Sequence, residues 1–244
     1  MPSLTLSDRL IWFAHCPKAG GTSVEHFMVS RWGSAVGHLH WGWDRWWQRG
    51  GWRVADPPNS PQHLVWADAE PRLPRAPDAV FAIVRDPVAR MASEYRWQRH
   101  GRRGTRLGKT LSYLPFSLWL RLMLMVRTRN PHAFDNHLRL QSDFAPAHAK
   151  VFHLENGLGP VLTWLTDIVG ESAGTLALPH AIQTPGKTPI DPRDAALIGA
   201  AFATDYRRFG YLRPPAVKPV RQGYDVLASL LAPWVSKLER RGLI

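Results

Sequence analysis

The sequence is poor in cysteine and has no uninterrupted hydrophobic run that could cross a bilayer. Its one cysteine, Cys16, excludes an internal disulfide and zinc sites built from several cysteines. The most apolar stretch, Leu111–Val126, is broken by Pro115 and Arg121 and is too short to span a membrane. Residues 1–8 lack the charged segment and apolar core of a secretory signal. We therefore expect a protein of a reducing, cytoplasmic compartment.

Acidic residues are also scarce. The 244 residues include 31 Lys and Arg but only 19 Asp and Glu, which gives a formal net charge of +12. Such an excess attracts anionic partners, and the candidates are nucleic acid, an acidic polysaccharide or a nucleotide cofactor. The densest basic run, from Arg96 to Lys109, fits either a solvated face or the lip of a groove for an acidic acceptor. A chain of this length can bury one sizeable core, in one or two domains.

The Walker pattern of nucleotide-triphosphate loops is absent, but a different glycine loop follows the apolar segment Leu10–Phe13. In the Walker pattern the lysine follows the last glycine, whereas here Lys18 precedes Gly20 and Gly21. A strand that enters a helix through a glycine turn presents backbone N–H groups and a positive dipole end to an anion. The loop therefore favours a phosphate or sulfate site. The alternative is a tight turn in which glycine serves the geometry alone.

A second strand-to-helix junction carries an arginine. Val80–Val84 is a continuous apolar run, typical of a strand buried on both faces. Asp86 is a favourable N-cap and Pro87 a favourable first helical residue. Arg85 is therefore expected at the carboxyl end of a strand, where open parallel sheets bind ligands, with Ser93 about two turns into the helix. The alternative is a plain junction in which Arg85 pairs with Asp86.

Together the two motifs, P-K-x-G-G-T-S and R-D-P-x-x-R-x-x-S-x-Y, resemble those of sulfotransferases that use 3′-phosphoadenosine 5′-phosphosulfate (PAPS). The most similar branch is the carbohydrate and heparan 2-O type, and the resemblance covers about residues 8–213. It implies that Arg85 and Ser93 bind the 3′-phosphate. The residues that it assigns to the 5′-phosphosulfate are Pro17, Lys18, Ala19, Gly20, Gly21, Thr22 and Ser23.

Three further segments match the family more weakly. His63–Trp66 resembles a histidine segment between the motifs, Phe134–Leu140 a later family segment, and Tyr206–Tyr211 a closing strand region. Two positions depart from the family pattern. Ala19 stands where a threonine is common, and Gln62 where a glycine often precedes the histidine.

The resemblance implies transfer of a sulfuryl group from PAPS to an acceptor hydroxyl, on a saccharide, with adenosine 3′,5′-bisphosphate (PAP) as the product. Lys18 would stabilise charge on the leaving group, and His63 is the candidate base, with a core histidine as the alternative. We expect no metal and no nucleic acid partner. Because the family's eukaryotic members are membrane-anchored, the lack of an anchor implies a bacterial setting. The alternatives are a kinase-like phosphotransferase and a non-catalytic polyanion-binding protein.

The alternation of apolar strands, loops and helices predicts an α/β class with a P-loop-like, three-layer domain, in which helices flank a central, mainly parallel sheet. Strands are expected at Leu10–Ala14, His63–Trp66, Val80–Val84 and Lys150–Leu154. Helices are expected at Thr22–Val29, Val88–Trp97, Phe116–Val126, Asp135–Leu140, Leu158–Val169 and Asp191–Asp205.

Composition changes near residue 213, so we expect a sulfotransferase domain over residues 1–213 and a proline-rich linker with an amphipathic helix over 214–244. Apolar residues recur at helical spacing from Leu227 to Leu238, and Pro233 would bend or split this helix. The helix fits docking on the domain, a dimer contact or a membrane surface.

Two segments are open to several interpretations. Five of the twelve tryptophans lie within residues 41–52, where they could pack over the sheet or form a platform for sugar rings. His38 and His40 form a pair that only weakly indicates metal binding.

Overall fold

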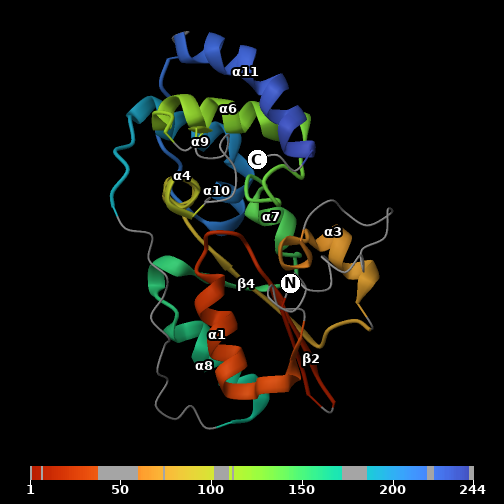
Figure 1. Cartoon of the computed structure of the whole chain (residues 1–244). Helices are drawn as coiled ribbons and strands as arrows, with labels where there is room; N and C mark the ends of the chain where they lie inside the picture. The colour runs from red at the N-terminus through yellow and green to blue at the C-terminus, as the bar shows by residue number, and fades with distance from the viewer. Residues whose placement is uncertain are drawn as a thin grey trace. The chain divides into compact units, whose positions relative to one another are not determined.

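The computed structural model describes residues 2–6, 8–37, 60–73, 75–101, 110–111, 113–171, 186–218 and 223–241. The chain divides into two compact units (Figure 1): residues 1–85 with 141–182, and residues 86–140 with 183–244. The tryptophan-rich segment 41–52, His38, His40 and residues 102–109 of the basic run lie outside the described residues.

The first unit is built on a five-stranded mixed sheet in the order β3-β1-β2-β4-β5. β2 is parallel to β4 and β4 to β5, whereas β1 is antiparallel to β2 and β3. The strands are β1 Ser3–Thr5, β2 Leu10–Ala14, β3 Val36–Gly37, β4 Ala79–Val84 and β5 Lys150–His153. The α/β class is therefore confirmed, but half of the strand pairs are antiparallel, so the sheet is not mainly parallel.

The central strands β2 and β4 form the core of this unit, as their apolar runs predict. All five residues of β2 and the last five of β4 are buried. Phe13 and Phe81 are paired in the register, and their rings stack with centroids 4.6 Å apart. Trp164 packs on the same Phe81 ring at 5.4 Å, and so places its helix on this face of the sheet.

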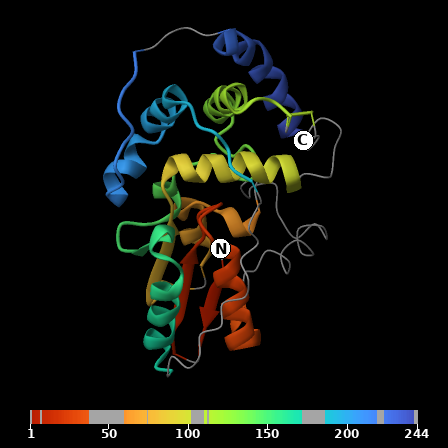
Figure 2. The same cartoon turned by 90° about the vertical axis from the view of Figure 1, so that its left-hand side faces the viewer.

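Short and long helices surround the sheet (Figure 2), with α1 and α8 running alongside the strands. Predicted helices at Thr22–Val29 and Leu158–Val169 are confirmed, with slightly different ends. The α-helices of the unit are α1 Gly21–Trp32, α3 Trp66–Ala69, α7 Gln141–Phe144 and α8 Gly159–Val169. The 3₁₀ helices are η1 Gly33–Ala35, η2 Pro61–His63, η3 Glu70–Arg72 and η4 Leu154–Asn156.

The strand expected at His63–Trp66 is wrong. His63 ends η2, and Trp66 begins α3. Leu64 and Val65 between them are extended and buried but belong to no strand of the sheet. These residues are apolar because the short connection that they form is buried. A four-residue pattern with such apolar residues is the same in a buried connection and in a strand, so the pattern cannot distinguish the two.

The described residues of the second unit form helices joined by turns and extended segments, without a strand. Its helices are α4 Pro87–Gly101, α6 Phe116–Arg129, α9 Pro192–Ala201, α10 Ala203–Phe209 and α11 Gly223–Arg240. The predicted helices at Val88–Trp97 and Phe116–Val126 are confirmed. Asp86 accepts a hydrogen bond from the Ala89 N–H at 2.8 Å, and this cap fixes the start of α4. No helix among the described residues has the length and apolarity that crossing a membrane requires.

Three expectations for this unit are wrong. The segment expected as a helix at Asp135–Leu140 is a turn, because Phe134, Asp135 and Asn136 have φ of 54°, 57° and 61° in the left-handed region. The helix expected at Asp191–Asp205 is two helices, which meet at Phe202 with φ of −115°. Most of Tyr206–Tyr211, expected as a strand, lies in α10.

Helix α11 packs along α6 within the second unit. It continues through Pro233, which lies inside the helix. The side chains that it buries are small, with Ala228, Ala232 and Val235 facing the core. The contacts therefore join the C-terminal helix to the helical unit, a grouping that differs from the boundary expected at residue 213.

Candidate functional site

The loop between β2 and α1 has two residues with a left-handed backbone at the start of a helix. Lys18 and Gly20 have φ of 66° and 83°, both in the left-handed region. Gly20 is the N-cap of α1, and no side chain caps this helix end by a hydrogen bond in the described part of the chain. The first turn also lacks acidic residues. The positive end of the helix dipole therefore lies next to the Lys18 backbone, with nothing acidic in the turn to neutralise it.

Packing requires a glycine at position 21, and the left-handed backbone favours one at position 20. A Cβ atom at Gly21 would lie 2.0 Å from Nε2 of His15, which is far inside contact distance. At Gly20 a Cβ would lie 2.9 Å from Cδ1 of Leu154. Steric reasons alone therefore explain both glycines. Because glycine has no side chain, both positions also allow a ligand to approach the backbone closely.

The remaining loop residues differ in accessibility. Pro17 and Ala19 are buried, and Lys18 is half-buried. Thr22 is exposed, whereas Ser23 is buried and donates its N–H to the Gly20 carbonyl at 3.2 Å. Of the two predicted hydroxyl donors, only that of Thr22 is therefore open to a ligand from solvent.

Arg85 lies against this loop. It follows β4, the parallel neighbour of β2, and its Nη1 donates to the Lys18 carbonyl at 3.4 Å. Gln141 fixes the Arg85 backbone, since its Oε1 accepts the Arg85 N–H and its Nε2 donates to the Arg85 carbonyl, each at 2.8 Å. The structure thus brings together Lys18 and Arg85 from the two predicted motifs. Gln141 was not predicted, because 56 residues separate it from Arg85.

A buried polar cluster, the Glu25 cluster, lies beneath the loop. The His15 Nδ1 lies 2.9 Å from Oε1 of Glu25, and Nε2 of Gln62 donates to the same oxygen at 2.9 Å. Burial alone would raise the pKa of Glu25. The charge of His15 and the polar contacts with His15 and Gln62 outweigh burial, so the pKa of Glu25 lies below its usual range. Sequence analysis missed Glu25, whose only signal is a carboxylate on the inner side of an amphipathic helix.

His63 joins the edge of this cluster. Its ring centroid lies 5.3 Å from that of His15, and Oγ of Ser60 lies 3.5 Å from its Nδ1. The side chain is buried, at 8% exposure. A buried position fits a core histidine, and a base in a closed site would also be shielded from water. The catalytic role of His63 therefore stays a prediction.

Ser93 belongs to the second unit, on α4, and is buried. The neighbouring Glu94 anchors a second polar cluster, the Glu94 cluster. Its Oε2 lies 2.7 Å from Nδ1 of His137, and its Oε1 accepts from Nε2 of Gln98 at 2.8 Å. Gln98 in turn accepts from Nε1 of Trp119 at 2.9 Å. These contacts fix the part of α4 that carries Ser93.

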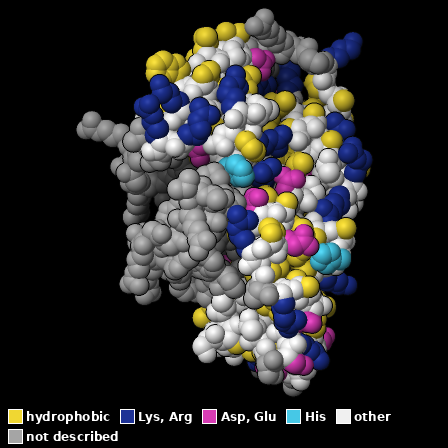
Figure 3. Space-filling model, turned by 90° about the vertical axis from the view of Figure 1, so that its right-hand side faces the viewer, with side chains coloured by type: hydrophobic (Ala, Val, Ile, Leu, Met, Phe, Trp, Pro, Cys, Tyr) yellow, Lys and Arg dark blue, Asp and Glu magenta, His cyan; other side chains and the backbone are white. Residues whose placement is uncertain are grey.

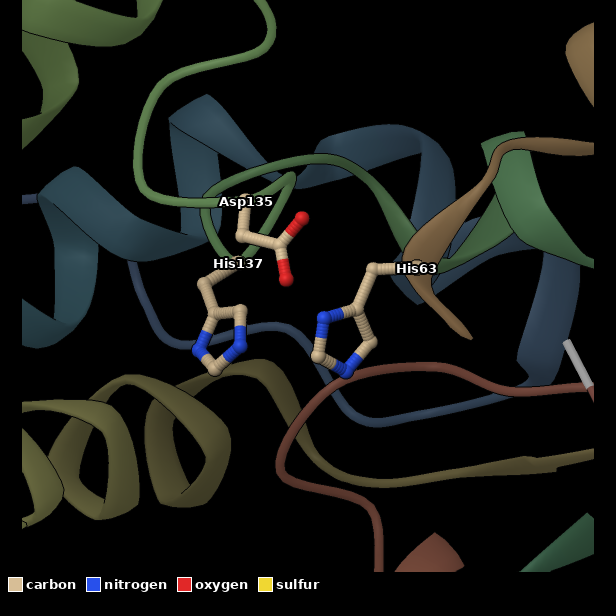
Figure 4. Close-up of side chains that lie close together, drawn as sticks. All are labelled: His63, Asp135 and His137. Atoms are coloured by element: carbon tan, nitrogen blue, oxygen red, sulfur yellow. The ribbon is translucent and has the colours of Figure 1, made fainter. Parts of the chain in front are cut away.

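His137 follows the left-handed turn, and Figure 4 shows its ring beside Asp135 on the same stretch of chain. The left-handed conformation costs about 1–2 kcal/mol for most non-glycine residues such as Phe134, and Asp and Asn tolerate it better. Glu239 of α11 helps to hold the turn, because its Oε1 accepts the Phe134 N–H at 2.9 Å. The ring of Trp97 packs on His137 with centroids 4.9 Å apart.

A cationic cavity of about 290 Å³ opens in the second unit. Three cations line it, Arg96, Arg99 and Lys187, beside the rings of Tyr95 and Phe116. Arg96 donates to the Thr188 hydroxyl at 3.3 Å, and Arg99 lies over the Tyr95 ring at 5.4 Å. No carboxylate lines the described wall of this cavity, so it suits a small anionic group. Arg96 and Arg99 come from the predicted basic run.

Positive charge is also spread over the one face of the molecule that Figure 3 shows. On the face shown in Figure 3, dark blue lysine and arginine side chains appear at many points, with acidic side chains among them. The excess of 12 positive charges is therefore not confined to one patch on that face. A net positive charge attracts anions in general, and local geometry must select the ligand.

Comparison of the chain with models of known families, with curated proteins and with solved structures finds no match.

Proposed function

We propose that the protein transfers a sulfuryl group from PAPS to a hydroxyl of a saccharide acceptor. The observation that carries the proposal is the meeting of Lys18 and Arg85 at the positive end of α1. Lys18 has a left-handed backbone in the loop after β2. Arg85 lies at the end of β4, the parallel neighbour of β2. The same residues are those that the two sulfotransferase-like motifs assign to the donor.

The first unit fits a phosphosulfate group. The β2–α1 loop offers the positive end of α1, the exposed Thr22 hydroxyl and Lys18, and Arg85 lies beside it at the end of β4. The donor supplies an activated sulfuryl group, whose transfer forms an oxygen–sulfur bond to the acceptor and breaks the sulfur–oxygen bond to the nucleotide phosphate. Lys18 would stabilise the charge that develops on the leaving oxygen, and donors fixed in advance at such a position supply much of the catalysis in many enzymes.

The acceptor hydroxyl must lose its proton during transfer. His63 is the proposed base, because an imidazole accepts a proton near neutral pH. The resemblance also assigns Ser93 to the 3′-phosphate. The cationic cavity of the second unit, lined by Arg96, Arg99 and Lys187, would by itself hold a small anionic group.

Nucleotide binding and turnover test the proposal together. Titration calorimetry should show that PAP binds the wild-type protein and that ATP competes poorly. Lys18→Ala should reduce sulfate transfer onto a glycan panel by about a hundredfold or more, because it removes a group that acts mainly in the transition state. Its affinity for PAP should change much less.

The exposed Lys150→Ala serves as the matched control and should leave both measurements unchanged. Arg85→Ala and Ser93→Ala should weaken PAP more than AMP, which lacks the 3′-phosphate. His63→Ala should bind PAP normally and lose turnover. Tight binding of ATP in place of PAP would favour a phosphotransferase and would overturn the proposal.

A further inference from the structure

Helix α11 carries an exposed apolar row. Leu230 and Trp234 are 65% and 67% exposed, and Val226 and Leu227 are 42% and 41% exposed. A helix advances 100° per residue, so these four side chains lie on one face. We call this row, with the basic residues that follow it, the α11 outer face. At the top of Figure 3, where α11 lies in Figure 1, hydrophobic and basic side chains are mixed.

The opposite face of α11 is the one that docks. Ala228, Ala232 and Val235 are buried against α6. The helix thus packs mainly through small side chains, with the partly buried Leu231 beside them, and leaves Leu230 and Trp234 in solvent. A helix selected only for stability would bury its large apolar residues, since burial contributes in proportion to apolar area. The outer face is therefore a candidate contact surface.

The charges of α11 are divided between the two faces. Its two acidic residues are paired inside the unit. Asp225 accepts from Nε of Arg121 at 2.9 Å, and Glu239 accepts from Nδ2 of Asn130 at 2.6 Å. The basic residues at the C-terminal end are exposed instead: Lys237, Arg240 and Arg241. The outer face is therefore apolar and basic, with both helix carboxylates withdrawn from it.

We propose that the α11 outer face binds an anionic lipid surface and lies in the plane of its headgroups. An amphipathic helix with basic and large apolar side chains binds in this way, with tryptophan at the boundary between headgroups and acyl chains. α11 does not meet the length and apolarity criteria of a membrane span, so it would lie on the membrane. This proposal does not depend on the sulfotransferase reaction.

Charge favours a lipid surface over a second copy of the chain. Each copy carries a net charge of +12, so two copies that meet through this face would bring like charges together. A surface rich in anionic lipids has the opposite sign, and it attracts each basic residue near it. The α11 outer face combines this attraction with apolar side chains that can leave water.

Co-sedimentation of the full chain with lipid vesicles tests the proposal. The wild-type protein should bind vesicles of phosphatidylcholine mixed with phosphatidylglycerol, and should bind phosphatidylcholine alone at least about tenfold more weakly. The double variant Leu230→Gln, Trp234→Gln and the triple variant Lys237→Glu, Arg240→Glu, Arg241→Glu should each lose about tenfold or more of this binding. Circular dichroism should show unchanged folding, because the substituted side chains are exposed.

Matched variants elsewhere in the second unit distinguish the face from general effects. Leu212→Gln removes an apolar side chain that is 95% exposed and lies outside α11. The exposed triple variant Arg193→Glu, Arg207→Glu, Lys218→Glu changes the net charge as much as the α11 triple variant. Both controls should keep vesicle binding. Equal loss in these controls, or no vesicle binding by the wild type, would overturn the proposal. So would a dimer in ultracentrifugation that Leu230→Gln, Trp234→Gln converts to a monomer.

Discussion

The Glu25 cluster of the first unit and the Glu94 cluster of the second are built from the same three types of side chain: a glutamate, a histidine and a glutamine. In each, a fully buried glutamate on a helix lies within 3 Å of a histidine Nδ1 and accepts from a glutamine amide. The histidines are His15 and His137, and the glutamines are Gln62 and Gln98. A buried carboxylate is costly unless cations or donors pair with it, and both clusters supply such partners. The two partners of Glu94 contact different oxygens, whereas His15 and Gln62 contact the same oxygen of Glu25.

The two clusters differ in what they hold together. In the Glu94 cluster the glutamine comes from the same helix, four residues on, and the histidine follows a left-handed turn. In the Glu25 cluster the glutamine comes from a separate 3₁₀ helix, and His15 packs directly under Gly21. The Glu94 cluster therefore fixes helix packing, whereas the Glu25 cluster also fixes the backbone of the proposed anion loop.

Among the predictions, removal of either carboxylate should have the largest effect on stability. Glu25→Gln and Glu94→Gln keep the shape of the side chain but leave a histidine without its carboxylate. Each should lower the free energy of unfolding by about 3 kcal/mol, the scale of a broken buried ion pair. Urea unfolding of the full chain measures this loss. The control variant Glu70→Gln, at an exposed position, should change the free energy of unfolding little. An equally small change in Glu25→Gln or Glu94→Gln would show that the carboxylate of that cluster does not stabilise its unit.

Gly21→Ala should disturb the Glu25 cluster and leave the Glu94 cluster unchanged. The added Cβ would meet the His15 ring at 2.0 Å, so the ring or α1 must move, at a cost of about 1–3 kcal/mol. The variant should also weaken PAP binding, because the loop backbone shifts with the ring. Gly159→Ala is the matched control, since Gly159 also begins a helix and a Cβ there meets nothing within 4 Å. If both variants bind PAP alike, the Glu25 cluster does not position the loop.

The smallest expected effect is a dependence on pH. The pKa of Glu25 is lower in the folded protein than its ordinary value of 4.5. Its ionised form thus contributes stability above pH 4.5, and this contribution is lost as the pH falls through the lower, folded pKa. The difference in unfolding free energy between the wild type and Glu25→Gln should therefore shrink below pH 4.5. A difference that stays constant down to acid unfolding would show that the carboxylate is not the group responsible.

The features that could be predicted from the sequence are those with a local physical cause. Leu10–Ala14 and Val80–Val84 are strands because continuous apolar runs require burial on both faces. Asp86 and Pro87 start α4 because a carboxylate caps the free N–H groups and proline fixes the first helical φ. The positions of Lys18 and Arg85 follow from these same strands, so sequence patterns alone locate the candidate site.

Other elements have no local cause strong enough to predict them. β1 and β3 have three and two residues, too few for any periodicity, yet they make the sheet mixed. The turn at Phe134–Asn136 has three successive left-handed φ values, which Phe134 disfavours. Glu239 holds the turn from a distant helix, and Glu94 contacts His137 just after it. Sequence patterns indicate the preference of each segment, and here tertiary contacts outweigh that preference.

The sequence by itself determined the α/β class, the central strands, the main helices and the identity of the two motifs that carry the proposed donor site. Only the tertiary structure decided that His15, Glu25 and Gln62 meet beneath the loop. It also decided that α11 packs through Ala228, Ala232 and Val235 while Leu230 and Trp234 stay exposed. Apolar periodicity identifies a helix, but which face is buried depends on the partner surface. Which buried charges pair is likewise decided by folding. A charged side chain needs a partner only where burial removes it from water, and burial occurs only once the chain has folded.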